Sequence, residues 1–306
     1  MAVAVIFPGQ GTQAARMGEP WRDHPAWTVV ERAEEALGEP LAPLLLADSP
    51  EVLSRTRDSQ LAVLLTSLVS WEAARVCLPA PSPVAFAGHS LGQVTALIAS
   101  GCLSLEDGIR LAAQRAEATQ RAADETPGRM AALVGASESQ AAEACAAAPG
   151  ECWIANDNAP GQIVVAGTPS GIERATKAAE AAGVRRVTPL RVGGAFHTPL
   201  MAPAAEALAG PLADTTFATP AATVYSNAEA APCSDPDGWR TRFAAHLVSP
   251  VRWRSSMQAM VSDGADAFLE VGFGSTLAAL AKRCVPGVPV SSVGTPADAH
   301  ALMEVA

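Results

Sequence analysis

A serine flanked by two glycines stands between two apolar segments near residue 90. Gly88-His89-Ser90-Leu91-Gly92 fits the pattern G-x-S-x-G, with an apolar run on either side of it. Between a strand and a helix, this pattern is typical of a nucleophile elbow, a sharp turn that exposes the serine hydroxyl. The helix that follows would direct free N–H groups and its positive dipole end toward a developing oxyanion. The alternative is a glycine-rich turn whose serine only caps the helix.

A serine nucleophile needs a base, and the sequence offers five candidates: His24, His89, His197, His246 and His300. His89 adjoins the serine, and at a tight turn we expect its side chain to point away from that of Ser90. His197 follows Gly193-Gly194-Ala195-Phe196, in a loop where a catalytic histidine would be held. His246 competes with it on spacing alone, and ordinary surface placement is the alternative for any single loop histidine.

The elements that must position these residues follow the alternation of an α/β sheet. A long buried helix is expected over residues 58–77, and the elbow leads into an apolar helix over Val94–Ala99. Short apolar runs that suit buried parallel strands occur at Val3–Phe7, Pro83–Ala87, Thr223–Ser226 and Ala267–Val271.

The middle of the chain has a different order, β-α-β-β-α-β. Its strands are expected at Met130–Val134, Cys152–Ala155, Gln162–Ala166 and Arg185–Val192, and its helices at Ser137–Ala148 and Ser170–Ala182. This order is typical of a ferredoxin-like unit. We therefore predict an α/β catalytic domain of residues 1–126 and 195–306, with a parallel sheet flanked by helices. Residues 127–194 would form an inserted ferredoxin-like subdomain.

Composition excludes some classes of function. The chain has 306 residues, is 49% hydrophobic and carries a formal net charge of -10. Such an acidic chain is a poor non-specific ligand for nucleic acid or for a membrane surface. Two segments are locally basic, around Arg185, Arg186 and Arg191 and around Arg240, Arg242, Arg252 and Arg254. They are either solvated arginines or a landing site for an acidic partner or for phosphates.

The cysteines and the N-terminus indicate a cytoplasmic, soluble protein. The six cysteines contain no C-x-x-C pair and have no histidine at metal-ligand spacing, so we expect buried free thiols and no metal. The N-terminus has no basic start and reads as a first strand rather than a signal peptide. The longest mainly apolar run, Leu61–Trp71, is too short to span a bilayer.

Beyond these patterns, the chain resembles the malonyl-CoA:acyl carrier protein transacylase family, which includes the acyltransferases of polyketide synthases. The resemblance runs from Val3 to about Arg283, and its motifs occur in the family's order. They are Phe7-Pro8-Gly9-Gln10-Gly11-Thr12-Gln13, the elbow, Arg115, Asn156-Asp157-Asn158-Ala159-Pro160-Gly161-Gln162, Gly194-Ala195-Phe196-His197-Thr198-Pro199-Leu200-Met201, Ser249-Pro250-Val251-Arg252-Trp253 and Glu270-Val271-Gly272-Phe273-Gly274. The resemblance implies a hydrolase-like α/β core that carries a ferredoxin-like subdomain.

The resemblance also implies a role for each matching residue. Ser90 would be the nucleophile and His197 its base, oriented by the backbone carbonyl of His246. The backbone N–H groups of Gln10 and Leu91 would form the oxyanion hole.

Arg115 would hold the free carboxylate of a malonyl group, because a guanidinium gives a two-pronged grip that lysine cannot reproduce. Coenzyme A thioester would be the substrate and the phosphopantetheine thiol of an acyl carrier protein the acceptor, with no cofactor. The reaction would be ping-pong acyl transfer.

Four positions depart from the family's usual residues. Gln93 stands where Glu is common, Ala116 where Gly is common, His246 where Gln is common and Phe273 where Pro is common. His246 is the departure closest to the chemistry, because a titratable ring near the base can alter the pKa of that base.

Phe196 precedes the histidine as in the malonyl-preferring relatives. Its ring would fill the space that an α-branched acyl group needs. A longer dicarboxylic or unusual extender unit, or a carrier-bound acyl group, is left open.

Two other functions compete with malonyl transfer. An esterase or an editing acyl hydrolase on the same fold would use the same serine and histidine, but would have little use for Arg115. A non-catalytic docking module for carrier protein would not need Ser90, His197 and Arg115 together. The sequence does not distinguish fatty-acid from polyketide synthesis, and it identifies neither the carrier protein nor the oligomeric state.

Overall fold

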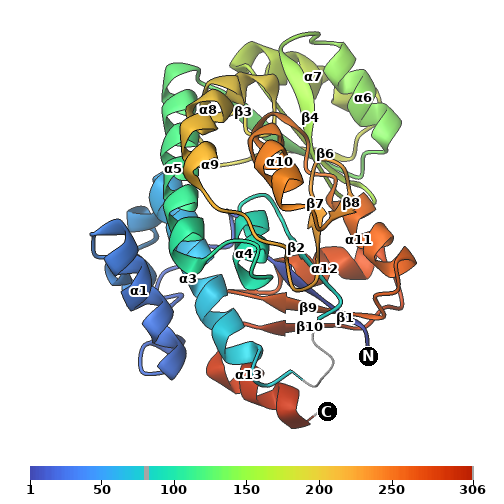
Figure 1. Cartoon of the computed structure of the whole chain (residues 1–306). Helices are drawn as coiled ribbons and strands as arrows, with labels where there is room; N and C mark the ends of the chain where they lie inside the picture. The colour runs from blue at the N-terminus through green and yellow to red at the C-terminus, as the bar shows by residue number, and fades with distance from the viewer. Residues whose placement is uncertain (79–82, 305–306) are drawn as a thin grey trace.

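The computed structural model describes residues 1–78 and 83–304, which are built around a six-stranded sheet (Figure 1). In spatial order the strands are β10 (Val290–Val293), β9 (Ala267–Val271), β1 (Val3–Phe7), β2 (Ala85–Gly88), β7 (Thr223–Ser226) and β8 (Ala231–Cys233). The first five pair in parallel, and β8 pairs antiparallel with β7. The expected parallel sheet is therefore confirmed, with one antiparallel edge strand in addition.

Both faces of this sheet are covered, as the continuous apolar strands predict. Along β1, Val5 and Phe7 belong to a large core on one face, whereas Ala4 and Ile6 belong to a second core on the other. Successive side chains of a strand point to opposite faces, so five residues supply both cores.

Thirteen α-helices lie in the described residues. They are α1 (Thr28–Leu37), α2 (Ala42–Leu46), α3 (Thr56–Ala74), α4 (Gly92–Ala99), α5 (Leu105–Glu125), α6 (Glu138–Ala146), α7 (Pro169–Ala181), α8 (Ala202–Ala207), α9 (Ala209–Asp214), α10 (Pro236–Val248), α11 (Trp253–Ser262), α12 (Thr276–Cys284) and α13 (Pro296–Ala301). Helices α3, α4 and α5 contribute to the larger core, and α11 and α12 to the smaller one. Within the described ranges, no helix combines the length and the apolarity that a membrane span requires.

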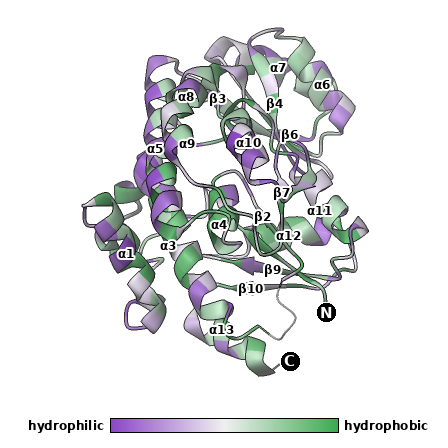
Figure 2. Cartoon of the chain, viewed as in Figure 1, coloured by the Kyte–Doolittle hydropathy of each residue, from purple (hydrophilic) through white to green (hydrophobic). Residues whose placement is uncertain are grey.

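Helix α3 is buried on nearly all sides, as the long apolar run predicts. Helix α5 packs against α3 and has one exposed side. Figure 2 shows that α5 is largely hydrophilic, whereas α4 is mostly hydrophobic. Ser104 caps α5 by accepting a hydrogen bond from the backbone N–H of Asp107 at 3.0 Å. In Figure 1, α5 runs from the level of the central sheet up to the second, smaller sheet.

The smaller sheet contains four antiparallel strands in the order β4-β5-β3-β6. Its strands are β3 (Arg129–Val134), β4 (Cys152–Ala159), β5 (Gln162–Gly167) and β6 (Arg186–Pro189). With α6 and α7, the chain order is the predicted β-α-β-β-α-β. All four strands lie between residues 127 and 194, the limits predicted for the subdomain.

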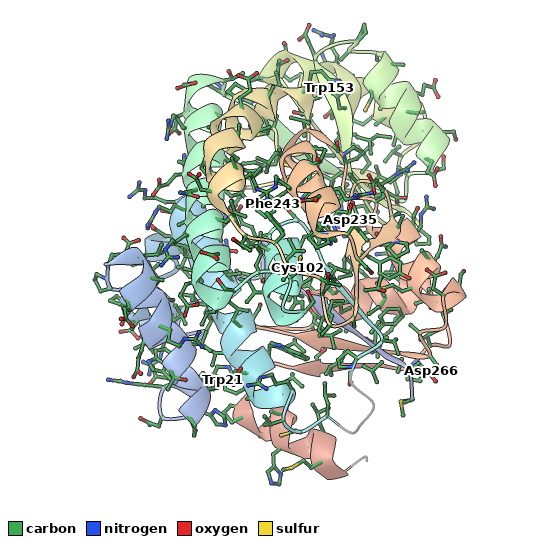
Figure 3. All side chains as sticks on the ribbon, in the orientation of Figure 1. Trp21, Cys102, Trp153, Asp235, Phe243 and Asp266 are labelled. Carbon is green, nitrogen blue, oxygen red and sulfur yellow. The ribbon has the colours of Figure 1, made fainter. Side chains whose placement is uncertain are left out.

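The smaller sheet lies above the central sheet in the view of Figures 1 and 3. Trp153 of β4 lies at the upper end, whereas Trp21 and Asp266 lie at the lower end. The faces of the smaller sheet have different partners. One packs on α6 and α7, and the other packs Met130, Ala155 and Val164 against the loop that contains Ala195. The second face thus lies over the residues that follow the subdomain.

The Asn156–Gln162 motif, which lies between the strands expected at Cys152–Ala155 and Gln162–Ala166, is itself mostly strand. Residues up to Ala159 belong to β4, and only Pro160-Gly161 turns. The backbone N–H of Asp157 donates to Val251 O at 2.9 Å, and that of Val251 donates to Ala155 O at 2.8 Å. These long-range bonds extend the strand and join the smaller sheet to the segment after α10.

Candidate active site

Ser90 lies at the turn between β2 and α4, the strand–turn–helix context that the sequence predicts. Its φ is +53°, in the left-handed region that a serine rarely adopts. The strain is a feature of nucleophile elbows, and the surrounding bonds maintain it. The backbone N–H of Ser90 donates to Asn227 Oδ1 at 2.7 Å, and Asn227 Nδ2 donates to Gly88 O at 2.8 Å.

The glycines of the elbow are required by close backbone contacts. A Cβ on Gly92 would lie 2.1 Å from the carbonyl oxygen of Phe7, and one on Gly88 would lie 1.9 Å from Gly92 O. Gly9 faces the elbow from the first loop, where a Cβ would lie 2.3 Å from His89 O. The loop after β1 and the elbow after β2 are therefore in direct contact, at the carboxyl ends of neighbouring parallel strands.

His197 is the histidine that meets the serine. Its Nε2 lies 2.7 Å from Ser90 Oγ, and its Nδ1 lies 3.1 Å from the backbone oxygen of His246. Because a carbonyl can only accept, Nδ1 carries the proton and Nε2 is free to accept the serine hydroxyl proton. Like the serine, His197 has a positive φ, +61°.

The other histidines do not contact the serine hydroxyl. His89 Nε2 lies 2.8 Å from Asn158 Oδ1, and the ring packs against Trp253. His24 Nδ1 accepts from the N–H of Ala26, and His300 is exposed in α13. His246 contributes its backbone oxygen, as the resemblance implies. The sequence left the choice between His197 and His246 open on spacing, and the fold places their rings 5.0 Å apart.

Arg115 projects from the middle of α5 into the same place. Its side chain is buried, with 4% of the residue exposed. Nη2 donates to Ser90 Oγ at 3.2 Å and Nη1 donates to Gln60 Oε1 at 2.6 Å. No carboxylate lies within ion-pair distance of it among residues 1–78 and 83–304. A buried guanidinium without a counter-ion is costly to maintain and is suited to binding an anionic ligand.

These groups line one cavity of about 110 Å³. Six of the seven residues singled out from the sequence line it: Gln10, Ser90, Leu91, Arg115, Phe196 and His197. The seventh, His246, lies behind the base. Among the described residues, the backbone N–H groups of Gln10 and Leu91 have no hydrogen-bond acceptor. Two free N–H groups on the wall beside a serine fit an oxyanion hole.

Burial determines the charge states in this cavity. Burial, and then the positive charge of Arg115, lower the pKa of His197 to about 3, so the ring is neutral at physiological pH. Burial also lowers the pKa of Arg115 to about 10, which leaves it charged. The site therefore combines a neutral base, a hydroxyl and a fixed cation.

Sequence reasoning missed Gln60 and Asn227. Gln60 orients the guanidinium, and Asn227 fixes the elbow. A glutamine at the edge of a long apolar helix was a usable signal for Gln60. For Asn227 the signal was its position directly after a strand, at the edge where the other strand ends meet.

Glu270 and three arginines of the second basic segment make contacts within the fold, whereas Arg252 is exposed. Glu270 is buried and accepts from the N–H groups of Leu277 and Ala278, at the start of α12. In the second basic segment, Arg242 pairs with Glu229, Arg254 pairs with Asp157 and Glu138, and Arg240 donates to backbone oxygens.

The first basic segment is different. Arg185, Arg186 and Arg191 are exposed, and no ion pair forms with them in the part of the chain that the structure describes. In the same part, no group of three or more His, Cys, Asp or Glu side chains is placed to hold a metal ion.

Comparison with known proteins agrees with this geometry. Residues 4–296 match the acyl transferase domain family. The chain is 36% identical over 307 residues to the malonyl CoA-acyl carrier protein transacylase of Haemophilus influenzae, covering 98% of each chain. It is 35% identical over 309 residues to the protein of that name in Escherichia coli, covering 99% of each.

Solved structures of malonyltransferases are also similar to this chain. An acyl-carrier-protein-S-malonyltransferase from Bartonella henselae superimposes with a TM-score of 0.94 at 33% identity, over 100% of this chain and 99% of the other. A malonyl-transacylase in complex with a type II PKS acyl-carrier protein superimposes with a TM-score of 0.94 at 31% identity, over 100% of both chains.

Proposed function

Because the chain belongs to the acyl transferase domain family, we propose that it moves a malonyl group from coenzyme A to an acyl carrier protein through an ester on Ser90. The observation that carries this proposal is the contact of three groups in one cavity. The hydroxyl of Ser90 lies 2.7 Å from a base, His197, and 3.2 Å from a buried guanidinium, Arg115. The first contact suits acyl transfer, and the second suits an acyl group with a free carboxylate.

In the first half-reaction, Ser90 Oγ attacks the thioester carbonyl carbon and its proton passes to His197 Nε2. The oxyanion that forms accepts hydrogen bonds from the N–H groups of Gln10 and Leu91. The carbon–sulfur bond then breaks, and His197 returns the proton to the leaving thiolate, which departs as coenzyme A thiol. The backbone oxygen of His246 holds the proton on Nδ1 throughout, and stabilises the imidazolium while it exists.

In the second half-reaction, the phosphopantetheine thiol of the carrier protein gives its proton to His197 Nε2 and attacks the ester carbon. The carbon–oxygen bond to Ser90 breaks, and the proton returns to the serine oxygen. Each step is carried by the coenzyme A thioester, the carrier thiol and this chain's own side-chain and backbone groups. The neutral state of His197 suits both steps, because each begins with a proton transfer to Nε2.

Arg115 is assigned the malonyl carboxylate. With no counter-ion among the described residues, its guanidinium gains a charge-assisted partner only when an anionic acyl group enters. Phe196 lines the same cavity and is assigned the exclusion of α-branched acyl groups.

Exposed arginines at the two ends of β6, one of them beside cavity-lining residues, support the carrier-protein half of the proposal. Arg191 lies between Leu190 and Val192, which line the cavity, and Arg185 and Arg186 lie at the start of β6. They are available to an acidic protein surface or to the phosphate of the phosphopantetheine arm.

We place the enzyme in the cytoplasm, since all six cysteines are free thiols, which is typical of a reducing compartment.

The test is intact-protein mass spectrometry after brief exposure to malonyl-CoA, acetyl-CoA or a longer acyl-CoA, with and without holo carrier protein. We expect a malonyl adduct that persists in water, passes to the carrier thiol and is absent from Ser90→Ala. Ser100→Ala, which changes a buried serine outside the cavity, is the matched control and should load normally. Rapid loss of the adduct to water, or preferential loading of simple acyl groups, would instead indicate an acyl hydrolase.

A further inference from the structure

Five hydrogen bonds close a circuit that begins and ends on the nucleophile. The backbone N–H of Ser90 donates to Asn227 Oδ1 at 2.7 Å, and the backbone N–H of Asn227 donates to Gln93 Oε1 at 2.8 Å. Gln93 Nε2 lies 3.5 Å from His246 Nδ1. The circuit returns through the 3.1 Å bond from His197 Nδ1 to His246 O and the 2.7 Å contact of His197 Nε2 with Ser90 Oγ.

Backbone partners fix the direction of these bonds. Asn227 faces a backbone donor with Oδ1 and a backbone acceptor, Gly88 O, with Nδ2, so its amide has one orientation. Gln93 likewise accepts a backbone N–H through Oε1, which leaves its NH₂ group facing His246 Nδ1. An NH₂ group only donates, so Nδ1 of His246 is the acceptor in this contact and the ring proton is on Nε2, which has no hydrogen-bond partner among the described residues.

The surroundings of His246 disfavour a charged ring. The residue is 4% exposed, its ring lies 5.0 Å from that of His197, and the other charged or titratable groups that act on it are Arg115 from α5 and His89 from the elbow. Burial and these neighbours lower the pKa of His246 well below its ordinary value. A proton on Nδ1 would also set an N–H against the NH₂ group of Gln93.

We propose that Asn227, Gln93 and His246 are positioning residues that join the backbone of Ser90 to the imidazole of His197, and that Gln93 keeps His246 neutral as its Nε2–H tautomer. The inference rests on the proposed function, since it takes Ser90 and His197 as nucleophile and base. The linked residues come from α4, from the loop after β7, from α10 and from the loop before α8. The circuit thus sets the angle at which the base meets the hydroxyl.

The circuit explains why two of the departures noted in the sequence belong together. With glutamine at position 93 and histidine at position 246, the amide donates and the ring accepts. With the family's more common glutamate and glutamine, the carboxylate would accept and the amide at 246 would donate. Either arrangement places one donor against one acceptor, whereas glutamate at 93 with histidine at 246 would draw a proton onto Nδ1 and create a cation beside His197.

The first test measures the protonation state of His246 in the absence of substrate. Nitrogen-15 NMR of imidazole-labelled protein is recorded between pH 5 and pH 8 for wild type, Gln93→Glu, His246→Gln and the double variant. We expect the wild-type His246 to stay neutral with its proton on Nε2, and Gln93→Glu to show a His246 that titrates in this range. Gln114→Glu, an exposed glutamine of α5, is the control and should match wild type. A wild-type His246 that titrates in this range, or an unchanged Gln93→Glu spectrum, would overturn the proposal.

The second test measures malonyl loading of Ser90 over the same pH range. We expect wild type to be flat from pH 6 to pH 8 and Gln93→Glu to be about tenfold slower at pH 6, with an acid limb. His246→Gln, which keeps a neutral acceptor opposite Gln93, should lose less of the loading rate than Gln93→Glu and should show no acid limb. The double variant should recover to within about threefold.

If Gln93→Glu and the double variant lost malonyl-loading rate equally, the proposed circuit would be overturned. If Gln93→Glu does not fold, recovery of folding in the double variant supports the proposal and failure of both contradicts it. Absence of malonyl loading in wild type would overturn the proposed function and leave the NMR result standing, so the two failures are distinguishable.

Discussion

The guanidinium of Arg115 donates a hydrogen bond to the hydroxyl of Ser90 across 3.2 Å, so the cation is in direct contact with the proposed nucleophile. A second hydrogen bond, from Nη1 to Gln60 Oε1 at 2.6 Å, keeps the guanidinium in place. Once Ser90 carries an acyl group, its oxygen becomes an ester oxygen and a poor acceptor. The same N–H can then turn to a carboxylate on the acyl group, which is a stronger, charge-assisted acceptor.

Replacing Arg115 should therefore change selectivity more than the chemical step. We expect Arg115→Ala to lower the rate of malonyl loading by about 100-fold, since a charge-assisted hydrogen bond contributes about 1.5–3 kcal/mol. Acetyl loading should change by less than about threefold. Loading rates with the two acyl-CoAs, measured by quenched mass spectrometry, test this. Arg110→Ala, at an exposed arginine of the same helix, is the control. Equal losses for both substrates would contradict the carboxylate role.

Phe196 should limit the size of the acyl group at its α-carbon. The ring lines the cavity, so Phe196→Ser should raise methylmalonyl loading relative to malonyl by about tenfold, within the range for one methyl group in an apolar pocket. Competition between the two acyl-CoAs, read by adduct mass, measures the ratio. Phe273→Ser is the control: it makes the same change at a partly buried phenylalanine that does not line the cavity, and it should leave the ratio unchanged. An unchanged ratio in Phe196→Ser would remove this residue from the specificity argument.

Gly9 should be irreplaceable because the first loop packs directly on the elbow. A Cβ there would lie 2.3 Å from His89 O, a backbone atom, so the loop that carries the Gln10 N–H must move away. We expect Gly9→Ala to slow loading by about 100-fold or more, the usual cost of losing one oxyanion donor. Gly210→Ala, in α9 with open space around it, should load normally and melt at the same or a slightly higher temperature. Normal loading by Gly9→Ala would contradict the role of this loop.

Two buried histidines and one partly buried histidine should make folding sensitive to mild acid. The pKa values of His89, His197 and His246 are all lowered, chiefly by burial, whereas an unfolded histidine has a pKa of about 6.5. Below that pH these three side chains bind more protons in the unfolded chain than in the folded one, so their contribution to stability is complete above about pH 6.5 and falls as the pH is lowered. Each histidine can contribute up to about 1.4 kcal/mol per pH unit.

Urea unfolding at pH 7.5, 6.0 and 5.0 measures this slope. His246→Gln should reduce it by up to about 1.4 kcal/mol per pH unit, and His300→Asn, at an exposed site, should leave it unchanged. The carboxylates Glu106 and Glu151, whose pKa values are also lowered, contribute only at lower pH, below their unfolded values of about 4.3. A slope that is the same in His246→Gln and wild type would contradict a buried neutral ring.

Elements with strong local signals were predictable from sequence. Val3–Phe7, Thr223–Ser226 and Ala267–Val271 are strands at the predicted residues, and the elbow lies where G-x-S-x-G places it. In these segments apolar runs, glycines and turns all favour the same local conformation, so little depends on distant residues. Segments that depend on distant partners were predicted less well. β8 and β10 were missed, and β4 extends through Asp157, whose N–H bonds to Val251 O.

The sequence by itself determined the chemical groups: a serine at a strained turn, histidines to choose from and, through family resemblance, an arginine for a carboxylate. Spacing left His197 and His246 open, and family resemblance chose His197; the tertiary structure showed its contact with Ser90. Only the tertiary structure showed that Arg115 is buried with no counter-ion among the described residues. Only it revealed Gln60, Asn227 and the circuit through Gln93. The reason is physical. Turn and strand preferences act over a few residues, whereas a base, its carbonyl and a cation converge from segments far apart in the chain, and their distances exist only once the two sheets have packed.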